Sequence, residues 1–144
     1  MKQLIVIDTN VILSALQSNK GKSFELISKI TEDVFNFAIS VPLILEYEAV
    51  LKRKLDRTIY TDSDIEDFIN YLCTVGIKTK LFYLWRPYLK DPFDDHVLEV
   101  TIQSNAKTIV TYNKKDFKKA ENLGLKILTP KEFLQTLQEV VVTI

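Results

Sequence analysis

The sequence predicts an α/β protein, with a three-layer α/β/α sandwich around a central and mostly parallel sheet. Short apolar, β-branched runs, of which Leu4–Ile7 is the clearest, are typical of strands that are covered on both faces. Stretches with apolar residues at helical spacing separate these runs over the whole length of the chain. Strands that alternate with helices form parallel sheets, because each helix carries the chain back to the edge where the next strand begins.

Each element has its own signal in the sequence. Apolar runs predict strands at residues 4–7, 35–41, 108–111 and 126–128, with a further strand or an extended arm at 77–84. Apolar residues at helical spacing predict helices over residues 11–16, 23–30, 42–55, 62–75, 93–102 and 130–137. Thr9 and Asn10 offer caps for the first helix, and Pro42 suits the first turn of the third. Asp62–Asp64 would cap the fourth helix, which Gly76 would end.

The length and composition exclude several classes of protein. A chain of 144 residues is expected to form a single domain over residues 1–144. Its 19 Lys and Arg residues balance its 19 Asp and Glu residues, so any nucleic-acid site must be a local basic patch. No stretch approaches the roughly 20 apolar residues of a membrane span, and the N-terminal apolar run is too short for a signal peptide. We therefore expect a cytoplasmic protein with no membrane partner.

The chain has one cysteine and one histidine. Cys73 cannot form an internal disulfide, and it lies within an apolar helical pattern, so we expect a buried structural thiol. A zinc site needs several His or Cys ligands, so this sequence disfavours one. We interpret His96 as incidental to the function.

Four acidic residues lie where an α/β sheet binds its ligands. Asp8 directly follows the first predicted strand, and Asp116 lies beyond the strand at 108–111. Glu46 lies one turn inside the helix after the second strand, and Asp95 lies near the start of a later helix. All four can face the crevice outside the carboxyl ends of the strands. Gathered carboxylates need a cation, hard oxygen ligands favour Mg²⁺ or Mn²⁺, and such a metal supports hydrolysis of a phosphodiester.

These residues also have purely structural interpretations. Asp8 could merely cap the first helix, and Asp116 could be a turn residue. In the cluster of Asp91, Asp94 and Asp95, at least one residue is expected to be a helix cap. We favour Asp95 for the site and keep Asp91 and Asp94 as additional candidates.

Short polar residues flank the carboxylates and are predicted to orient metal ligands and waters. They are Thr9, Asn10, Thr111 and Asn113.

Four stretches, in their order along the chain, resemble the PIN-domain ribonucleases, and most of all the VapC-like toxins of toxin–antitoxin pairs. These stretches are residues 6–11, 42–51, 91–98 and 109–117. The resemblance implies an α/β/α sandwich, an acidic pocket for Mg²⁺ or Mn²⁺ and cleavage of RNA. It also implies a homodimer and inhibition by a partner antitoxin. By position, it makes Asp8, Glu46 and Asp95 the first three metal carboxylates.

The sequence departs from the family pattern at Asn113. Many members carry an acidic residue at this position and a further Asp three residues on, whereas this chain keeps only Asp116. Asp116 is therefore the candidate for the fourth carboxylate. Whether a second metal binds, and whether Asn113 acts as a neutral oxygen ligand, stay open.

Two basic runs flank the predicted ligands and are candidates for binding RNA. The first run is Lys52, Arg53, Lys54 and Arg57, and the second is Lys114, Lys115, Lys118 and Lys119. A basic rim around an acidic pocket would contact the RNA backbone. Ordinary solvated helix and turn faces explain both runs about equally well.

Two apolar features of the chain suit core or interface packing. Tyr83, Trp85 and Tyr88 could stack on bases, but packing is the favoured interpretation. The tail Val140–Ile144 reads as a β-like segment, which would pair with another chain or add to its own sheet.

Three functions compete with a ribonuclease. A phosphatase of the haloacid-dehalogenase type would use Asp8 as its nucleophile, but it needs a second Asp where Asn10 stands. A phosphoryl-receiver domain needs a pair of acidic residues at the first strand, which this chain lacks. A degenerate domain that binds RNA or a protein without cleavage stays open because of Asn113.

Overall fold

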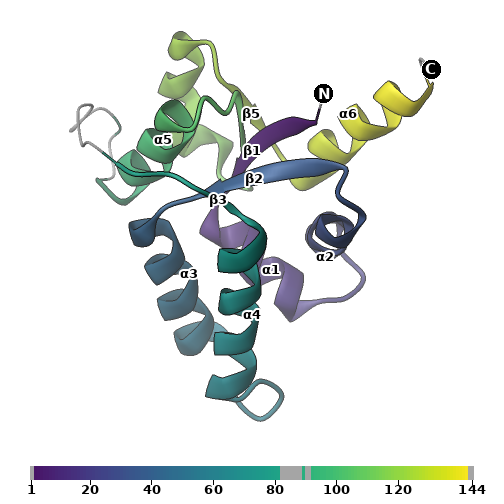
Figure 1. Ribbon diagram of the computed structural model, residues 1–144, viewed down its shortest axis with the longest axis vertical. Coiled ribbons are helices and arrows are strands. Elements are labelled where there is room, and N and C mark those ends of the chain that lie inside the picture. The colour runs from purple at the N-terminus through teal and green to yellow at the C-terminus, as the bar shows by residue number, and fades with distance from the viewer. Residues whose placement is uncertain (1, 82–88, 90–91, 143–144) are drawn as a thin grey trace.

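A computed structural model of the protein describes residues 2–81, 89 and 92–142 (Figure 1). Within them, five strands form one parallel sheet in the order β3-β2-β1-β4-β5. The strands are β1 (Gln3–Ile7), β2 (Phe35–Ile39), β3 (Ile77–Lys78), β4 (Thr108–Val110) and β5 (Lys126–Leu128). The α-helices are α1 (Thr9–Gln17), α2 (Lys22–Ser28), α3 (Val41–Lys54), α4 (Asp62–Val75), α5 (Pro92–Gln103) and α6 (Pro130–Val142). The 3₁₀ helices are η1 (Lys29–Glu32) and η2 (Lys114–Leu123).

Helices cover both faces of the sheet. Helices α1 to α4 lie on one side of it, and α5 and η2 lie on the other (Figure 1). The chain runs outward from β1 to β2 and β3, then crosses back to β4 and β5. Because crossovers between parallel strands are right-handed, this change of direction moves the later helices to the opposite face. The predicted α/β/α sandwich is confirmed.

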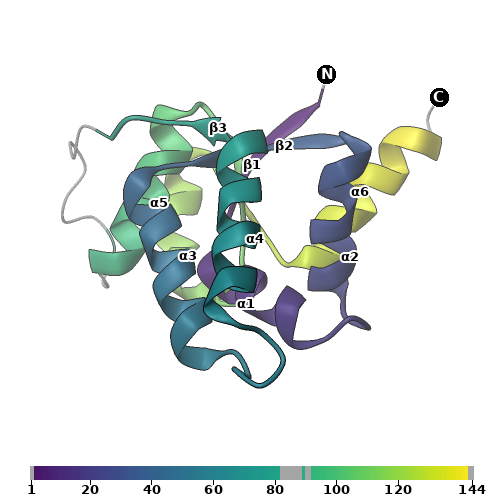
Figure 2. The same ribbon diagram turned by 60° about the horizontal axis from the view of Figure 1, so that its bottom comes forward.

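The centre of the core is β1, which explains its continuous apolar sequence. Ile5, Val6 and Ile7 are each at most 1% exposed, since helices cover both sides of this strand. Near the start of β2, α6 packs beside α2 (Figure 2). There the rings of Phe35 and Phe133 meet edge to face, with their centroids 5.4 Å apart.

Capping residues set the N-terminal boundaries of α3 and α4. The Ser40 hydroxyl accepts a hydrogen bond from the backbone N–H of Leu43 at 3.2 Å, so α3 begins at Val41 and β2 ends sooner than predicted. The cap of α4 is Thr61 rather than the predicted Asp62–Asp64. Thr61 and Asp64 form a reciprocal capping box.

The predicted β-like tail is wrong, because Val140–Val142 belong to α6. In the predicted strand or arm at 77–84, only Ile77–Lys78 forms a strand. Residues 82–84 lie outside the described part, as do Trp85 and Tyr88. Among the described residues, no helix is long and apolar enough to span a membrane.

Candidate active site

The candidate site lies at the point where the sheet reverses its strand order, between β1 and β4. Asp8 follows β1 and Thr111 follows β4, so both lie just past the carboxyl ends of neighbouring parallel strands. The backbone N–H of Asp8 donates to the carbonyl of Val110 at 2.9 Å, which ties the two strand ends together. Parallel α/β sheets bind ligands at such a switch point.

Asp8 is a buried carboxylate that is held by two hydrogen bonds. Its Oδ1 accepts from the backbone N–H of Thr9 at 2.9 Å, and its Oδ2 accepts from the Thr111 hydroxyl at 2.8 Å. Burial is the main cause that raises the pKa of Asp8 from the ordinary 3.8 to about 6. The charges of Glu46 and Asp116 add to this rise, and the hydrogen bonds oppose it. Asp8 also caps α1, so its structural and functional interpretations coexist.

Glu46 faces Asp8 from the second turn of α3. The Thr9 hydroxyl donates to Glu46 Oε2 at 2.6 Å, and His96 Nε2 lies 3.7 Å from the same oxygen. The next residue on α3, Tyr47, is 1% exposed, and its hydroxyl donates to the carbonyl of Ile7 at the end of β1. His96 thus lies beside Glu46 at the site, and its incidental role stays a prediction.

A network of short polar side chains joins α1 to the segment after β4. Asn10 Nδ2 donates to the Thr111 hydroxyl at 3.4 Å, and Asn10 Oδ1 accepts from the backbone N–H of Tyr112 at 3.3 Å. The Thr111 hydroxyl also accepts from the backbone N–H of Asn113 at 2.9 Å. Because this hydroxyl in turn donates to Asp8, the network fixes the carboxylate in place.

Carboxylates from four parts of the chain line one cavity of about 770 Å³. Asp8 and Glu46 lie on its wall with Asp94, from the first turn of α5, and Asp116, from the first turn of η2. Asn113 also lines the cavity. Segments that are far apart in the sequence thus bring their charges to one hollow.

The structure places Asp95 differently from the prediction. Its side chain is 1% exposed, and its Oδ1 accepts a hydrogen bond from the backbone N–H of Leu89 at 2.7 Å. Among the described residues that line the cavity, the acid from this stretch is Asp94. Asp91 lies outside the described residues. A metal-binding role for Asp95 stays a prediction.

A family model described as the PIN domain matches residues 4–115. The chain belongs to the PIN-domain family. Its fold is similar to that of VapBC2 from Rickettsia felis bound to a promoter DNA fragment, with a TM-score of 0.60 and 16% identity, over 88% of this chain and 98% of that one. It is also similar to VapBC-1 from nontypeable Haemophilus influenzae (TM-score 0.61, 13% identity, 90% and 99% covered) and FitAcB from Neisseria gonorrhoeae (0.56, 12%, 88% and 97%). No curated protein matches the sequence significantly.

PIN domains generally use divalent metal ions, and the donor atoms of this PIN domain suit a hard cation. The raised pKa of Asp8 reflects a buried negative charge that a cation would neutralise. Within the described part of the chain, however, no three His, Cys, Asp or Glu side chains lie close enough to form a ready-made metal cluster. The chemistry of the residues fits the ion, and the outer carboxylates would have to move toward Asp8 to bind it.

The basic side chains around this PIN-domain cavity divide into two groups. Lys52 forms ion pairs with Glu48 and Glu66, at 3.2 and 3.0 Å. Lys114 pairs with Glu132 at 3.0 Å. These two predicted RNA-binding residues are thus held by carboxylates of the protein itself.

Arg53 and Lys54, in contrast, line the cavity. Both belong to the basic run that follows Glu46 in the sequence. A signal for both was present, because residues seven and eight positions after Glu46 lie on the same face of a helix. Lys115 is exposed and is not among the described residues that line the cavity.

Proposed function

We propose that this PIN domain is a metal-dependent endoribonuclease that hydrolyses phosphodiester bonds in RNA, as the toxin of a toxin–antitoxin pair. The main support is the buried carboxylate of Asp8 at the strand switch point, in one cavity with Glu46, Asp94 and Asp116. The neighbours in structure support the toxin assignment, because their names describe VapBC and FitAB-type complexes.

In this proposal the carboxylates hold Mg²⁺ or Mn²⁺, which would supply an activated water and stabilise charge on a phosphoryl oxygen. Asp8 and Glu46 are the inner ligands, Asp116 is an outer one, and either Asp94 or Asp95 completes the set. Thr9 has a positioning role, because its backbone N–H holds Asp8 and its hydroxyl holds Glu46.

Further polar residues position the outer part of the site. Asn10 and Thr111 fix the segment that carries Asn113, and the Asn113 side chain adds a neutral oxygen at the cavity wall. Asp91 remains a supplementary candidate ligand.

Basic residues are proposed to hold the RNA backbone. Arg53 and Lys54 lie at the cavity wall, so they would contact the phosphates next to the cleaved bond. Lys52, Lys114 and Lys115 would give weaker, outer contacts. Binding would therefore depend on local positive charge, because the net charge of the chain is zero.

Partner proteins belong to the same proposal. We expect an antitoxin that inhibits the ribonuclease, and a homodimer as the active form. The complexes among the structural neighbours support an antitoxin, and the expected dimer rests on the resemblance to VapC-like toxins.

A second candidate function is a PIN domain that binds RNA or a protein without cleaving it. Asn113 favours it, because a neutral residue stands where an acid is common in the family. The lack of a ready-made three-ligand cluster in the described part of the chain also favours it.

Cleavage of a mixed single-stranded RNA pool, with Mn²⁺ and with EDTA, separates the two functions. The ribonuclease requires metal-dependent cleavage that Asp8→Asn lowers by at least about a hundredfold, since it removes a charged ligand. Calorimetric titration with Mn²⁺ should show weaker binding to the same variant. Folded wild-type protein that binds RNA but cuts nothing in Mn²⁺ or Mg²⁺ would support the binding module instead.

The same assay distinguishes Asp94 from Asp95. If Asp94 is the ligand, Asp94→Asn lowers both Mn²⁺ affinity and cleavage while the unfolding temperature changes little. If Asp95 only anchors Leu89, Asp95→Asn lowers the unfolding temperature and leaves Mn²⁺ affinity unchanged.

A further inference from the structure

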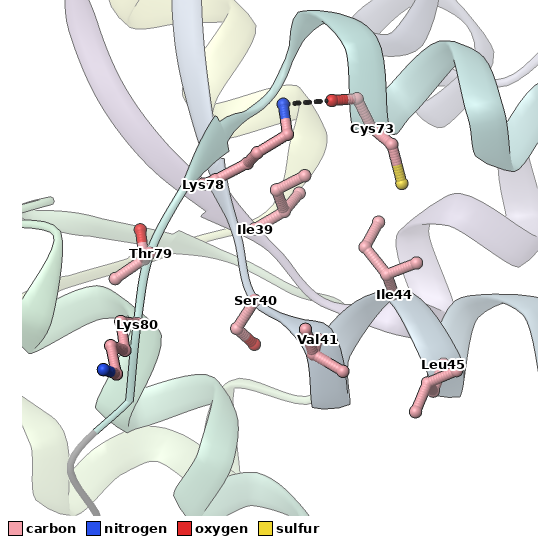
Figure 3. A pocket seen from close by; sticks show the side chains of 9 residues that line it. All are labelled: Ile39, Ser40, Val41, Ile44, Leu45, Cys73, Lys78, Thr79 and Lys80. Carbon is pink, nitrogen blue, oxygen red and sulfur yellow. Dashed lines mark hydrogen bonds between the residues drawn. The ribbon is translucent and has the colours of Figure 1, made fainter.

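A second hollow, with mainly apolar walls, lies at the start of α3 (Figure 3). Its volume is about 470 Å³, within the range of cavities that bind compact apolar groups. The end of β2 contributes Ile39, the start of α3 contributes Val41 and Ile44, and the end of α4 contributes Cys73. Leu45 lines this hollow and the acidic cavity alike, so the two share a wall.

The apolar side chains at this corner are unusually exposed. Val41 is 72% exposed and Leu45 is 59% exposed, although both belong to a helix that packs on the core. Val75 and Ile77 are close by in the chain, at the junction of α4 and β3, and are 44% and 42% exposed. Clustered apolar groups in water mark a surface that another molecule covers.

The charge around the hollow is positive. Lys78 and Lys80 line it, and none of the described lining residues is acidic. The Lys78 ammonium donates to the carbonyl of Cys73 at 2.6 Å, which holds it beside the cavity (Figure 3). A segment that enters this hollow therefore gains most if its apolar side chains are flanked by carboxylates.

The strand beside the hollow, β3, is the outermost strand of the described sheet on this side. The backbone N–H of Thr79 donates to the carbonyl of Ile39 at 2.8 Å and so faces β2. Backbone groups alternate in direction along an extended chain, so those of Lys78 and Lys80 face the outer edge. An extended peptide binds such an edge by continuing the sheet.

We propose that this corner binds an extended segment of a partner protein in which apolar and acidic residues alternate. The segment lies along the outer edge of β3, places its apolar side chains in the hollow and sets its carboxylates beside Lys78 and Lys80. A bound segment would touch Leu45 and thus the wall of the acidic cavity. The proposal does not depend on RNA cleavage.

The test is a selection of random peptides displayed on phage against the full-length protein. We expect the selected peptides to alternate apolar and acidic residues with a period of two. Synthetic copies, measured by fluorescence anisotropy, should bind Val41→Glu and Lys80→Glu at least about tenfold more weakly, which corresponds to about 1.4 kcal/mol. Val34→Glu, at another exposed apolar position, and Lys20→Glu are the matched controls and should bind like wild type.

Cys73 reports where the peptide binds, because it is the only cysteine in the chain and lines the hollow. With peptide at about ten times its Kd, alkylation of Cys73 by N-ethylmaleimide should slow roughly tenfold, since about a tenth of the sites stay open.

Several outcomes would overturn the proposal. They are the absence of any selected peptide that Val41→Glu weakens, a basic or helical pattern among the selected peptides, and a peptide that leaves Cys73 alkylation unchanged. Slower alkylation on raising the protein concentration alone would show that a second copy covers the hollow. Slower alkylation on adding single-stranded RNA would assign it to RNA.

Discussion

The two hollows that share Leu45 in their walls differ in kind, because one buries a charge and the other exposes apolar side chains. In the acidic cavity, Asp8 keeps a charge away from water, and burial raises its pKa to about 6. In the apolar hollow, Val41 and Leu45 leave hydrocarbon in contact with water. Neither arrangement is one that stability alone would favour. A cation would relieve the first and a partner surface the second, and helix α3 lines both hollows.

The largest expected effect compares the buried and exposed faces of α3. Leu43 is fully buried, so Leu43→Ala should lower the free energy of unfolding by about 2–5 kcal/mol. Leu45→Ala, two positions along the same helix, should change it by no more than about 0.5 kcal/mol. Urea unfolding of both variants measures the difference. A large loss in Leu45→Ala would mean that the apolar hollow is covered in solution.

The next effect concerns the buried charge of the acidic cavity. The folded protein binds the Asp8 proton more tightly than the unfolded chain does, so stability falls as the pH rises from about 4 to about 6. In EDTA at pH 8, Asp8→Asn should therefore raise the free energy of unfolding by up to about 3 kcal/mol. The gain should disappear below about pH 4, where Asp8 is protonated in both states.

Thermal unfolding in EDTA across this pH range checks the prediction. At pH 8, Mn²⁺ should make the wild type more stable than Asp8→Asn, because it binds the wild type more tightly than the variant. Equal stability of the wild type and Asp8→Asn at pH 8 in EDTA would contradict a cost of burying the Asp8 charge.

A smaller effect is expected from the hydroxyl that holds Asp8. Thr111→Val removes the donor to Asp8 and the acceptor for the backbone N–H of Asn113, which should cost about 1–3 kcal/mol. Thr101 is equally buried, but its hydroxyl donates only to the carbonyl of Val97 within α5. Thr101→Val should therefore cost less than about 1 kcal/mol. Similar losses in both variants would show that the Asp8 network adds no particular stability.

The smallest effect separates neighbouring cations on α3. In the Asp8→Asn background with EDTA, Arg53→Gln should weaken RNA binding and lower the slope of log Kd against log salt by about 1. Lys52→Gln should have a much smaller effect on both RNA affinity and the slope, because Lys52 is engaged by Glu48 and Glu66. Filter binding at several salt concentrations measures both. A larger effect of Lys52→Gln than of Arg53→Gln would place the RNA on the side of α3 that carries Lys52.

The sequence was most informative where one residue had a single plausible environment. A carboxylate directly after the continuous run Leu4–Ile7 could only lie at a strand end, and Asp8 does lie there. The parallel sheet followed from the alternation of strands and helices, whereas the strand order came only from the structure. Glu46 was placed by helical spacing alone, and the cavity contains it.

Other features needed three-dimensional information. Asp94 and Asp95 are adjacent, and the start of a helix can turn either one to the cavity, so spacing did not discriminate between them. The tail Val140–Val142 is β-branched but continues α6, because packing of the helix overrides a weak local preference. Cys73 was expected to be buried and is half-buried, since the hollow beside it is formed by β2, α3 and α4 together.

The hydrogen bond from Tyr47 to Ile7 joins the residues that precede Asp8 and follow Glu46 in the chain. The pKa of the Tyr47 phenol is raised well above its ordinary 10.0, mainly by burial, so it remains a donor in alkaline buffers. The end of β1 and the middle of α3 should therefore open as one cooperative unit in hydrogen exchange. Asp8 and Glu46 consequently lose little conformational entropy when a ligand binds between them, because folding has already ordered the backbone that carries both.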